Sequence, residues 1–262
     1  MSAKFGLIGH NISYSKSPKI HLFMAKKLGI DMTYELLDVD ADQIPSLIKD
    51  LKEGLFKGFN VTIPYKETVI PYIDILTSRA KKIGAVNTIY LKDGAIIGDN
   101  TDYDGFLGCL NINEIDPKGK QVYILGTGGA AKAVYAVLKD LGAHITVVSR
   151  NKKHADLFFG EVIEYKDIKP SKVDIYIQTT PVGTFPDVNA SVLTKNEVEG
   201  KTVVDLVYNP LVTQIMKHSQ KGVSGIYMLI IQALRSEEIW FDMKIELTKS
   251  LTKEMKEVIF DE

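Results

Sequence analysis

The sequence is poor in cysteine and tryptophan, with one residue of each among 262. A single cysteine, Cys109, excludes an internal disulfide framework and a zinc site built from several cysteines, and it fits a reducing compartment. The five histidines include no pair spaced four residues apart. We therefore expect no metal-dependent catalysis.

The chain also lacks an excess of charge and any long apolar run. Its 32 lysines and arginines nearly balance 33 aspartates and glutamates, so no global field would attract nucleic acid or acidic lipid. No segment approaches the roughly 20 apolar residues of a membrane-spanning helix. The opening residues MSAKFGLIGH have too short an apolar run for a secretory signal. We expect a cytoplasmic globular protein whose partners are neither nucleic acids nor membranes.

Strand-like and helix-like segments alternate along the chain, which predicts the α/β class. In the first hundred residues we expect strands at 4–9 and 33–39 and helices at 17–29 and 42–53. The dipeptide Asp93-Gly94 lies between two apolar runs and predicts a hairpin. In the first helix, Ser17 is a natural N-cap, Pro18 would be the first helical residue and Gly29 a stop.

A second alternating series begins at residue 120 and predicts a parallel sheet. Its strand-like runs are expected at 120–126, 144–150, 173–180 and 202–208, with a helix at 130–142. Two more helices follow, and the first of them could return the chain to the N-terminal domain. We therefore predict a substrate-binding catalytic domain formed by residues 1–102 and 235–262, and a doubly wound, Rossmann-type domain formed by residues 103–234.

The stretch from 122 to 153 is typical of a dinucleotide-binding unit. Gly126-x-Gly128-x-x-Ala131 directly follows an apolar strand and opens a helix. The first glycine permits the tight turn, the second lets backbone approach a pyrophosphate, and the alanine allows close packing of helix and strand. The alternative is a glycine-rich turn without a ligand. The complete strand–turn–helix–strand context favours the nucleotide site.

The end of the next strand indicates which nucleotide is bound. NAD enzymes place a carboxylate there, whereas a basic residue accommodates the 2′-phosphate of NADP. This sequence has Ser149-Arg150-Asn151-Lys152-Lys153 and no carboxylate. Arg150 offers a planar fork suited to phosphate, so we predict NADP(H). The two lysines could equally be solvated residues of a following helix.

Polar residues lie at strand ends in the first half of the chain, and each of them also has a purely structural explanation. In GFNVTIPYKE, residues 58–67, Phe59, Val61 and Ile63 alternate with Asn60 and Thr62, and Lys66 follows. This pattern fits either a half-exposed strand with a solvated lysine or a polar pocket with an ammonium at its rim. Ser17 and Asp102 could cap helices, and Gln232 in an apolar helix needs a partner of some kind.

Seven short motifs, in one order, resemble the shikimate dehydrogenase family. They extend from about residue 9 to about residue 235, and N-V-T-x-P-x-K is the most specific of them. The motifs are S-x-S-P at 15–18, N-V-T-x-P-x-K at 60–66, G-A-V-N-T at 84–88, N-T-D-x-x-G at 100–105, the glycine turn at 126, D-x-x-Y-x-P at 205–210, and a glutamine in the late apolar helix after Gly225.

The resemblance implies reversible hydride transfer between NADPH and 3-dehydroshikimate, which gives shikimate. It implies that Lys66 and Asp102 form the catalytic pair. It also implies contacts of Ser15, Ser17 and Tyr208 with the substrate carboxylate, and of Asn60, Thr62, Asn87 and Gln232 with ring hydroxyls. The cofactor contacts that we expect are Gly126, Thr127, Gly128, Gly129, Ala130, Ser149, Arg150, Asn151, Lys152, Thr180 and Gly225.

Four positions depart from the usual family pattern. Asn11 stands where proline is common, Tyr14 where histidine is frequent, Ser149 where asparagine is usual, and Tyr227 where a second glycine is common. None of them removes a proposed catalytic residue. Two alternatives stay open: a quinate/shikimate dehydrogenase with relaxed substrate or cofactor choice, and a non-catalytic NADP-binding regulator. The oligomeric state, including a homodimer, is also open.

Overall fold

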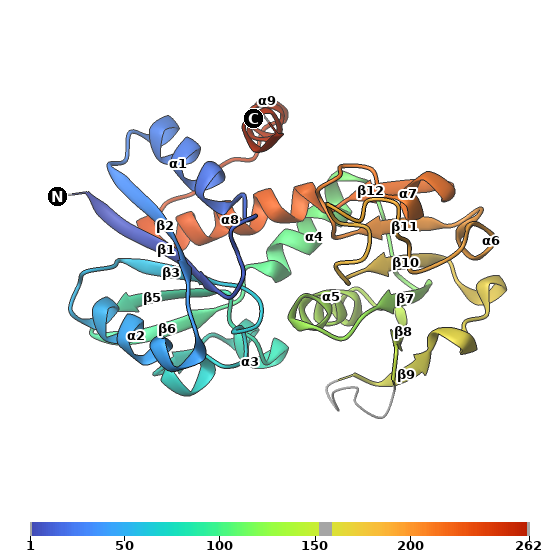
Figure 1. Ribbon diagram of the computed structural model, residues 1–262, viewed down its shortest axis with the longest axis horizontal. Helices are drawn as coiled ribbons and strands as arrows, with labels where there is room; N and C mark the ends of the chain where they lie inside the picture. Colours follow the sequence, from blue (N-terminus) through green and yellow to red (C-terminus); the bar gives the residue numbers. More distant parts are fainter. Residues whose placement is uncertain (1, 152–158, 261–262) are drawn as a thin grey trace. The chain divides into compact units, whose positions relative to one another are not determined.

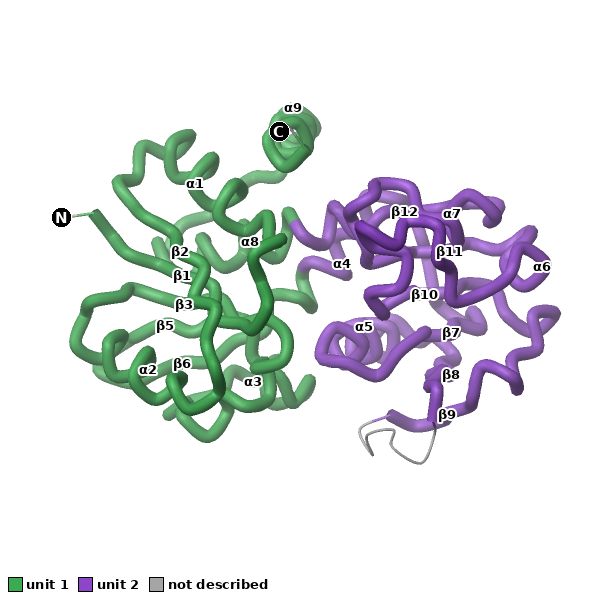
Figure 2. The backbone as a smooth tube through the Cα atoms, in the orientation of Figure 1, with its two compact units in different colours: residues 1–104, 230–262 green, residues 105–229 purple. Residues whose placement is uncertain are grey.

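The computed structural model describes residues 2–151 and 159–260, and the chain divides into two compact units (Figures 1 and 2). Unit 1 comprises residues 1–104 and 230–262, and unit 2 comprises residues 105–229. Both changes of unit fall inside helices, α4 (Asp102–Ile112) and α8 (Ile226–Phe241). Each unit contains a six-stranded sheet with helices, which confirms the predicted α/β class. None of the helices in the described ranges is long and apolar enough to cross a membrane.

Unit 1 is built on a mixed sheet with the strand order β2-β1-β3-β5-β6-β4. The middle strand β5 runs antiparallel to both β3 and β6, and the remaining pairs are parallel. The elements are β1 (Ala3–Gly9), α1 (Ser17–Leu28), β2 (Met32–Asp38), α2 (Ile44–Lys52), β3 (Gly58–Val61), β4 (Ile75–Leu76), α3 (Ser78–Ile83), β5 (Thr88–Lys92), β6 (Ala95–Asp99) and α9 (Lys249–Phe260), with short 3₁₀ turns at Ala41–Gln43 and Ile70–Tyr72.

The side chains of this sheet divide between two cores. Phe5 of β1 stacks on Trp240 of α8, with ring centroids 4.5 Å apart. Ile8 and Phe59 face the opposite way and pack in the cluster that includes Ile44 of α2. Figure 1 shows α1, α8 and α9 on one side of the sheet and α2 on the other. This alternation follows from the two-residue period of a strand.

Local sequence features explain several element boundaries. Asp93 and Gly94 adopt positive φ angles of 51° and 78° between β5 and β6, as the predicted two-residue hairpin requires. Gly29 ends α1 in the left-handed conformation, also as predicted. Asn11 has a φ of 56°, and its N–H donates to Asp38. Proline could do neither, so the departure at this position has a local structural consequence.

Two expectations about unit 1 were wrong. Helix α1 begins at Ser17 itself, and Lys16 occupies the N-cap without a side-chain bond, because Ser15 already accepts the Ser17 N–H in a turn one residue earlier. Strand β3 ends at Val61, so Ile63 does not share the buried side of Phe59. Ile63 is 63% exposed, since the chain turns there and Tyr65 N–H donates to the Thr62 carbonyl.

Unit 2 is a parallel sheet with the order β12-β11-β10-β7-β8-β9. Read from the other edge, this is the doubly wound Rossmann order, whose ligands bind where the strand order reverses, here between β7 and β10. The elements are β7 (Gln121–Leu125), α5 (Gly129–Asp140), β8 (His144–Ser149), β9 (Glu161–Glu164), β10 (Ile175–Gln178), α6 (Lys195–Val198), β11 (Thr202–Asp205), α7 (Gln214–His218) and β12 (Lys221–Ser224), with 3₁₀ turns at Tyr165–Asp167 and Pro170–Lys172.

Candidate active site

The ammonium of Lys66 and the carboxylate of Asp102 form a direct ion pair in unit 1. Lys66 Nζ donates to Asp102 Oδ2 at 2.5 Å. Lys66 lies in the turn after β3, and Asp102 is the first residue of α4. Their side chains are 15% and 7% exposed, so the lysine is largely sheltered rather than solvated. An ammonium held in this way can donate a hydrogen bond to an oxygen that enters beside it.

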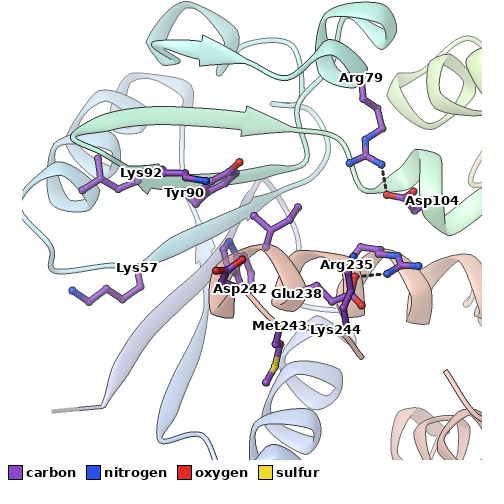
Figure 3. Close-up of a pocket in the computed structure, with 13 residues that line it drawn as sticks. Lys57, Arg79, Tyr90, Lys92, Asp104, Arg235, Glu238, Asp242, Met243 and Lys244 are labelled. Atoms are coloured by element: carbon purple, nitrogen blue, oxygen red, sulfur yellow. Dashed lines mark hydrogen bonds and ion pairs between the residues drawn. The ribbon is translucent and has the colours of Figure 1, made fainter. Parts of the chain in front are cut away.

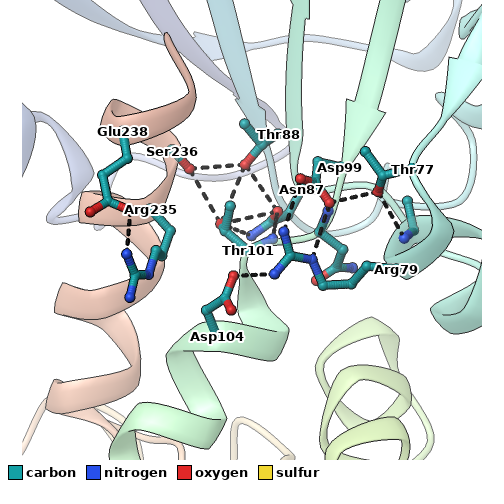
Figure 4. Close-up of polar contacts among 12 residues, drawn as sticks. Thr77, Arg79, Asn87, Thr88, Asp99, Thr101, Asp104, Arg235, Ser236 and Glu238 are labelled. Carbon is teal, nitrogen blue, oxygen red and sulfur yellow. Dashed lines mark hydrogen bonds and ion pairs between the residues drawn. The ribbon is translucent and has the colours of Figure 1, made fainter. Parts of the chain in front are cut away.

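Asn87 connects this pair to the interior of unit 1. Its Nδ2 donates to the second oxygen of Asp102 at 3.0 Å, and its Oδ1 accepts the backbone N–H of Thr101 at 2.7 Å. Thr88 lies next to it, and its hydroxyl is 2.9 Å from that of Ser236 on α8. Figure 4 shows these buried groups meeting between β5, the start of α4 and α8. Both oxygens of Asp102 therefore have side-chain partners.

The same network continues to the start of α1. Asn60 Nδ2 donates to Ser236 Oγ at 2.9 Å, and Asn60 Oδ1 accepts from the hydroxyl of Tyr34 at 2.7 Å. Ser17 lies beside Tyr34 and acts to lower the pKa of its phenol, and Ser15 Oγ donates to Ser17 Oγ at 3.2 Å. Hydrogen bonds thus join Lys66 to Tyr34 through residues of three strands and two helices, and the Ser15–Ser17 pair lies next to Tyr34.

Two other predicted substrate contacts lie beside this network. Thr62 is half-buried, and its hydroxyl has no hydrogen-bond partner in the part of the chain that the structure describes. Gln232 is half-buried one helical turn before Ser236, which donates to the Gln232 carbonyl at 3.1 Å. Tyr208 belongs to unit 2 and is half-buried. The structure therefore brings four of the predicted residues, Lys66, Asp102, Asn87 and Asn60, into one network. It places Ser15, Ser17, Thr62 and Gln232 in the same unit and Tyr208 in the other.

Arg79 of α3 holds the segment that carries Asp102. Its Nε and Nη2 donate to the two oxygens of Asp99 at 3.3 and 3.1 Å, and its Nη1 binds Asp104 (Figure 4). Burial alone would raise the pKa of Asp99, but hydrogen bonds from Arg79 and Thr77 outweigh it, so the pKa is lowered. Burial raises the pKa of Asp104. Arg79 therefore fixes residues on both sides of Asp102.

A second buried ionisable pair lies behind Tyr34. His21 Nδ1 is 2.8 Å from Glu237 Oε1, and both side chains are almost fully buried. The imidazole stacks on Tyr34 with ring centroids 4.3 Å apart. Burial raises the pKa of Glu237 above its ordinary value. Burial, followed by the nearby Glu237 carboxylate, raises the pKa of Tyr34, so the phenol stays a neutral donor to Asn60.

The glycine turn of unit 2 has the geometry that its sequence predicts. Gly126 adopts φ 117°, and a Cβ there would lie 2.6 Å from Thr179 Oγ1. Gly128 is the N-cap of α5, and a Cβ there would meet nothing within 4 Å. Open space above backbone N–H groups at the start of a 12-residue helix fits a pyrophosphate. Ala131 is fully buried against the sheet.

The other predicted cofactor residues lie at the carboxyl ends of neighbouring strands. Thr180 follows β10, and its methyl group would be 2.9 Å from a Cβ on Gly126, which places it beside the turn. Ser149 ends β8, and its hydroxyl donates to the carbonyl of Asn151 at 3.1 Å. Arg150 is exposed next to it. The predicted contact Lys152 lies outside the described residues.

Asp205 and Gly225 lie at the carboxyl ends of β11 and β12, the strands beyond β10. Asp205 ends β11, accepts the Val207 N–H at 2.9 Å and accepts the Thr213 hydroxyl at 2.6 Å. Burial raises the pKa of Asp205 to about 6, although these hydrogen bonds act to lower it. Gly225 donates its N–H to the Asp205 carbonyl, and a Cβ on it would lie 2.6 Å from Leu206 Cα. Only glycine fits there, because this Cβ would strike backbone.

Sequence reasoning missed several residues of the unit 1 network. They are Tyr34, Thr88, Thr101 and Ser236, with Arg79 and Asp99 beside them. Ser236 could have been found from the sequence, because a serine one helical turn after Gln232 lies on the same face of an otherwise apolar helix. Tyr34 had none, since a tyrosine in a strand usually reports packing. Among the described residues no three His, Cys, Asp or Glu side chains group as metal ligands would.

Comparison with known proteins gives the family of this chain. The profile of the shikimate dehydrogenase substrate binding domain matches residues 7–89. A shikimate dehydrogenase (NADP(+)) of Clostridium beijerinckii is 42% identical over 258 residues, 94% of this chain and 96% of the relative. The crystal structure of shikimate dehydrogenase 1 from Peptoclostridium difficile is 36% identical with a TM-score of 0.89, covering 99% of this chain and 98% of its own. The shikimate 5-dehydrogenase of Thermus thermophilus, solved in complex with NADP(H) and shikimate, is 30% identical with a TM-score of 0.85, covering 98% of each chain. The chain described here belongs to the shikimate dehydrogenase family.

Proposed function

We propose that this chain catalyses the reversible, NADP(H)-dependent reduction of 3-dehydroshikimate to shikimate. The observation that supports the proposal is the series of hydrogen bonds from Lys66 to Tyr34, with Ser15 and Ser17 next to it, because most of the substrate contacts expected of a family member lie along it in unit 1. Unit 1 is the proposed substrate domain, and unit 2 is the proposed NADP(H) domain. The cytoplasm, where NADPH is available, is the proposed location.

The proposed chemistry centres on Lys66. Reducing a ketone develops negative charge on its oxygen, and a positioned ammonium both stabilises that charge and delivers the proton. The carboxylate of Asp102 orients the ammonium and can accept a hydrogen bond from a neighbouring hydroxyl of the substrate. NADPH, when bound, supplies the hydride. Asn87 fixes the second oxygen of Asp102, so the carboxylate cannot rotate away from the lysine.

The remaining substrate contacts follow from their chemistry. The hydroxyls of Ser15 and Ser17, at the start of α1, suit a carboxylate. Tyr208 stays a predicted substrate contact. The amides of Asn60, Asn87 and Gln232 and the hydroxyl of Thr62 are proposed to bind ring hydroxyls. A ring with several hydroxyls and one carboxylate needs this number of separate polar partners.

The proposed cofactor site uses the turn from Gly126 to Ala130 for the pyrophosphate. Arg150 is proposed to bind the 2′-phosphate, with Ser149, Asn151 and Lys152 beside it. Thr180 and Gly225 are proposed to border the nicotinamide. The open space at Gly128, and the position of the turn where the strand order reverses, support this assignment.

Initial rates with shikimate and quinate, each with NADP⁺ and NAD⁺, test the proposal. We expect shikimate with NADP⁺ to give the highest kcat/KM. Hydrogen bonds to a charged group contribute roughly 1.5–3 kcal/mol, so we expect a tenfold to about hundredfold preference for NADP⁺. Preference for NAD⁺ would refute the role of Arg150, and preference for quinate would refute the substrate. Absence of any turnover would favour the non-catalytic regulator. A homodimer stays a prediction, which sedimentation of the purified chain tests.

A further inference from the structure

Unit 1 contains a pocket that shares no lining residue with the proposed active site. Its volume is about 900 Å³, within the range of small-molecule sites. Figure 3 shows it between β5 and the end of α8, with the Arg79–Asp104 ion pair at one end and Lys57 and Lys92 at the other. The lining residues are Lys57, Arg79, Tyr90, Leu91, Lys92, Asp104, Arg235, Glu238, Ile239, Trp240, Asp242, Met243 and Lys244.

Positive charge exceeds negative charge in this lining. Five of the side chains are lysine or arginine and three are aspartate or glutamate, whereas the whole chain has a net charge of −1. The two arginines are matched, Arg79 by Asp99 and Asp104, and Arg235 by Glu238. The side-chain ammonium groups of Lys57, Lys92 and Lys244 make no hydrogen bond or ion pair with any residue that the structure describes. The unmatched charge favours an anion.

The remaining lining residues favour an anion that carries a flat apolar part. Tyr90 and Trp240 are half-buried at the pocket, with Leu91, Ile239 and Met243 around them. Aromatic and thioether side chains offer faces on which a ring can stack. Because the lysines lie at the rim and these groups line the wall, a ring with a carboxylate or phosphate matches the pocket better than an inorganic ion does.

One wall of the pocket is connected to Asp102 through the ion pairs of Arg79. Arg79 binds Asp99 and Asp104, which flank Asp102 in the segment from β6 into α4. The Asp104 side chain is 25% exposed, so an anion in the pocket can compete with it for the Arg79 guanidinium. Loss of that bond frees the first turn of α4, which holds Asp102 against Lys66. A displacement of about 1 Å in a catalytic group costs up to about 10²-fold in rate.

We propose that this pocket is a second ligand site, which takes a small aromatic carboxylate or phosphate and lowers turnover by drawing Arg79 away from Asp104. The binding step stands on the pocket alone, and the kinetic step rests on the proposed function. The two are therefore tested by separate measurements.

The binding test uses Trp240, the only tryptophan of the chain, as a reporter within the pocket itself. Phenyl phosphate is titrated against tryptophan emission, with saturating NADP⁺ present to fill the proposed phosphate site of unit 2. Inorganic phosphate and phenol form separate arms. We expect a saturable change with phenyl phosphate at millimolar concentration and weaker responses to the other two. The double variant Lys92→Glu/Lys244→Glu should weaken binding by about tenfold or more.

The matched control is Lys26→Glu/Lys120→Glu, which changes the net charge equally at two exposed lysines outside the pocket. It should bind phenyl phosphate as the wild type does. An absent emission change, or equal affinity in both double variants, overturns the site. Self-association that is lost in the Lys92/Lys244 variant also overturns it, because the face would then be an interface between copies of the chain.

The kinetic test measures shikimate oxidation with and without phenyl phosphate. Saturating phenyl phosphate should lower kcat by about fivefold in the wild type and in the Lys26/Lys120 control, and should have no effect on the Lys92/Lys244 variant. Inhibition that persists in that variant overturns the regulatory step, because the inhibitor would then act at the catalytic residues. If the wild type does not oxidise shikimate, the proposed function fails, and the fluorescence titration still decides whether the pocket binds.

Discussion

Lys66 and Asp102 lie 36 positions apart in the sequence, yet Lys66 Nζ is 2.5 Å from Asp102 Oδ2. The two residues belong to different parts of the fold: Lys66 lies in the turn after β3, and Asp102 is the first residue of α4. The pair is sheltered, and a third side chain, Asn87, holds the free oxygen of the carboxylate. A surface lysine would not be held in this way, so the arrangement favours a chemical role.

Replacement of Lys66 by alanine tests that role. We expect kcat for shikimate oxidation to fall by about 10²–10⁴-fold, the usual contribution of a positioned acid–base group, while NADP⁺ binding stays unchanged. Single-turnover and steady-state rates give the chemical step, and a binding titration gives the affinity. Lys49→Ala, at an exposed lysine on α2, is the control. A Lys66→Ala enzyme with the wild-type rate would show that another group delivers the proton.

Arg79 is expected to position Asp102 without touching the substrate. Arg79→Gln should lower kcat by about tenfold and change KM much less, because the misplacement of a catalytic group acts mainly on the chemical step. Arg79→Lys keeps the charge but cannot bridge both carboxylates as a fork, so its kcat should be intermediate. Hydrogen exchange of residues 99–104 should be faster in both variants.

The control for Arg79 is Arg235→Gln. Arg235 lines the same pocket but pairs with Glu238 within α8, so it holds no part of the segment from Asp99 to Asp104. Its kcat should stay near that of the wild type. Equal losses in the two glutamine variants would mean that the charge of the region matters and that the bridge does not.

Features fixed by a few consecutive residues could be predicted from the sequence. The turn at Gly126 needs a positive φ and a close approach to Thr179. Both requirements select glycine, and the position is recognisable because it directly follows an apolar strand. The hairpin at Asp93-Gly94 is local in the same sense. The strands β4, β9 and β12 were not predicted, because they lie at sheet edges and are only two to four residues long.

The unit 1 network could be predicted only in part. Ser15, Asn60, Asn87 and Asp102 were found through motifs, but the groups that join them depend on the register of a mixed sheet. Tyr34 reaches Asn60 only because β1 lies between their strands. Arg79 reaches Asp99 only because α3 begins beside the end of β6. Periodicity within a segment carries no information about such pairings.

A substitution at Gly128 distinguishes the stability of unit 2 from its affinity for NADP⁺. A Cβ at this position meets no protein atom within 4 Å, and its φ of −77° is allowed for alanine. Gly128→Ala should therefore leave the free energy of unfolding unchanged and weaken NADP⁺ binding by about tenfold or more, because the methyl group would occupy the space proposed for the pyrophosphate. Calorimetric titration and urea unfolding give the two quantities.

Gly126→Ala provides the contrast to Gly128→Ala. Its Cβ would strike Thr179, and its φ of 117° disfavours any L side chain. This variant should lose both stability and NADP⁺ binding. Unchanged NADP⁺ affinity in Gly128→Ala would move the cofactor away from the turn.

Asp205 should make the stability of unit 2 depend on pH in a predictable direction. Burial raises its pKa from 3.8 to about 6 in the folded state, so the folded chain holds this proton more tightly than the unfolded chain does. The stabilisation that the protonated Asp205 gives to the folded state is complete below the pKa of Asp205 in the unfolded chain. It is lost as the pH rises through about 6, the pKa in the folded state. The difference between the two pKa values corresponds to about 3 kcal/mol.

Urea unfolding of the wild type and of Asp205→Asn between about pH 4 and about pH 7 measures this contribution. The asparagine keeps an oxygen that can accept the hydroxyl of Thr213 but cannot ionise. The stability advantage of the wild type over the variant should therefore shrink by up to about 3 kcal/mol across this range. Asp187→Asn, at an exposed aspartate of the same unit, should show no such trend. A constant difference between wild type and Asp205→Asn would mean that the carboxylate is ionised at no cost, and that the Val207 and Thr213 hydrogen bonds fully compensate its burial.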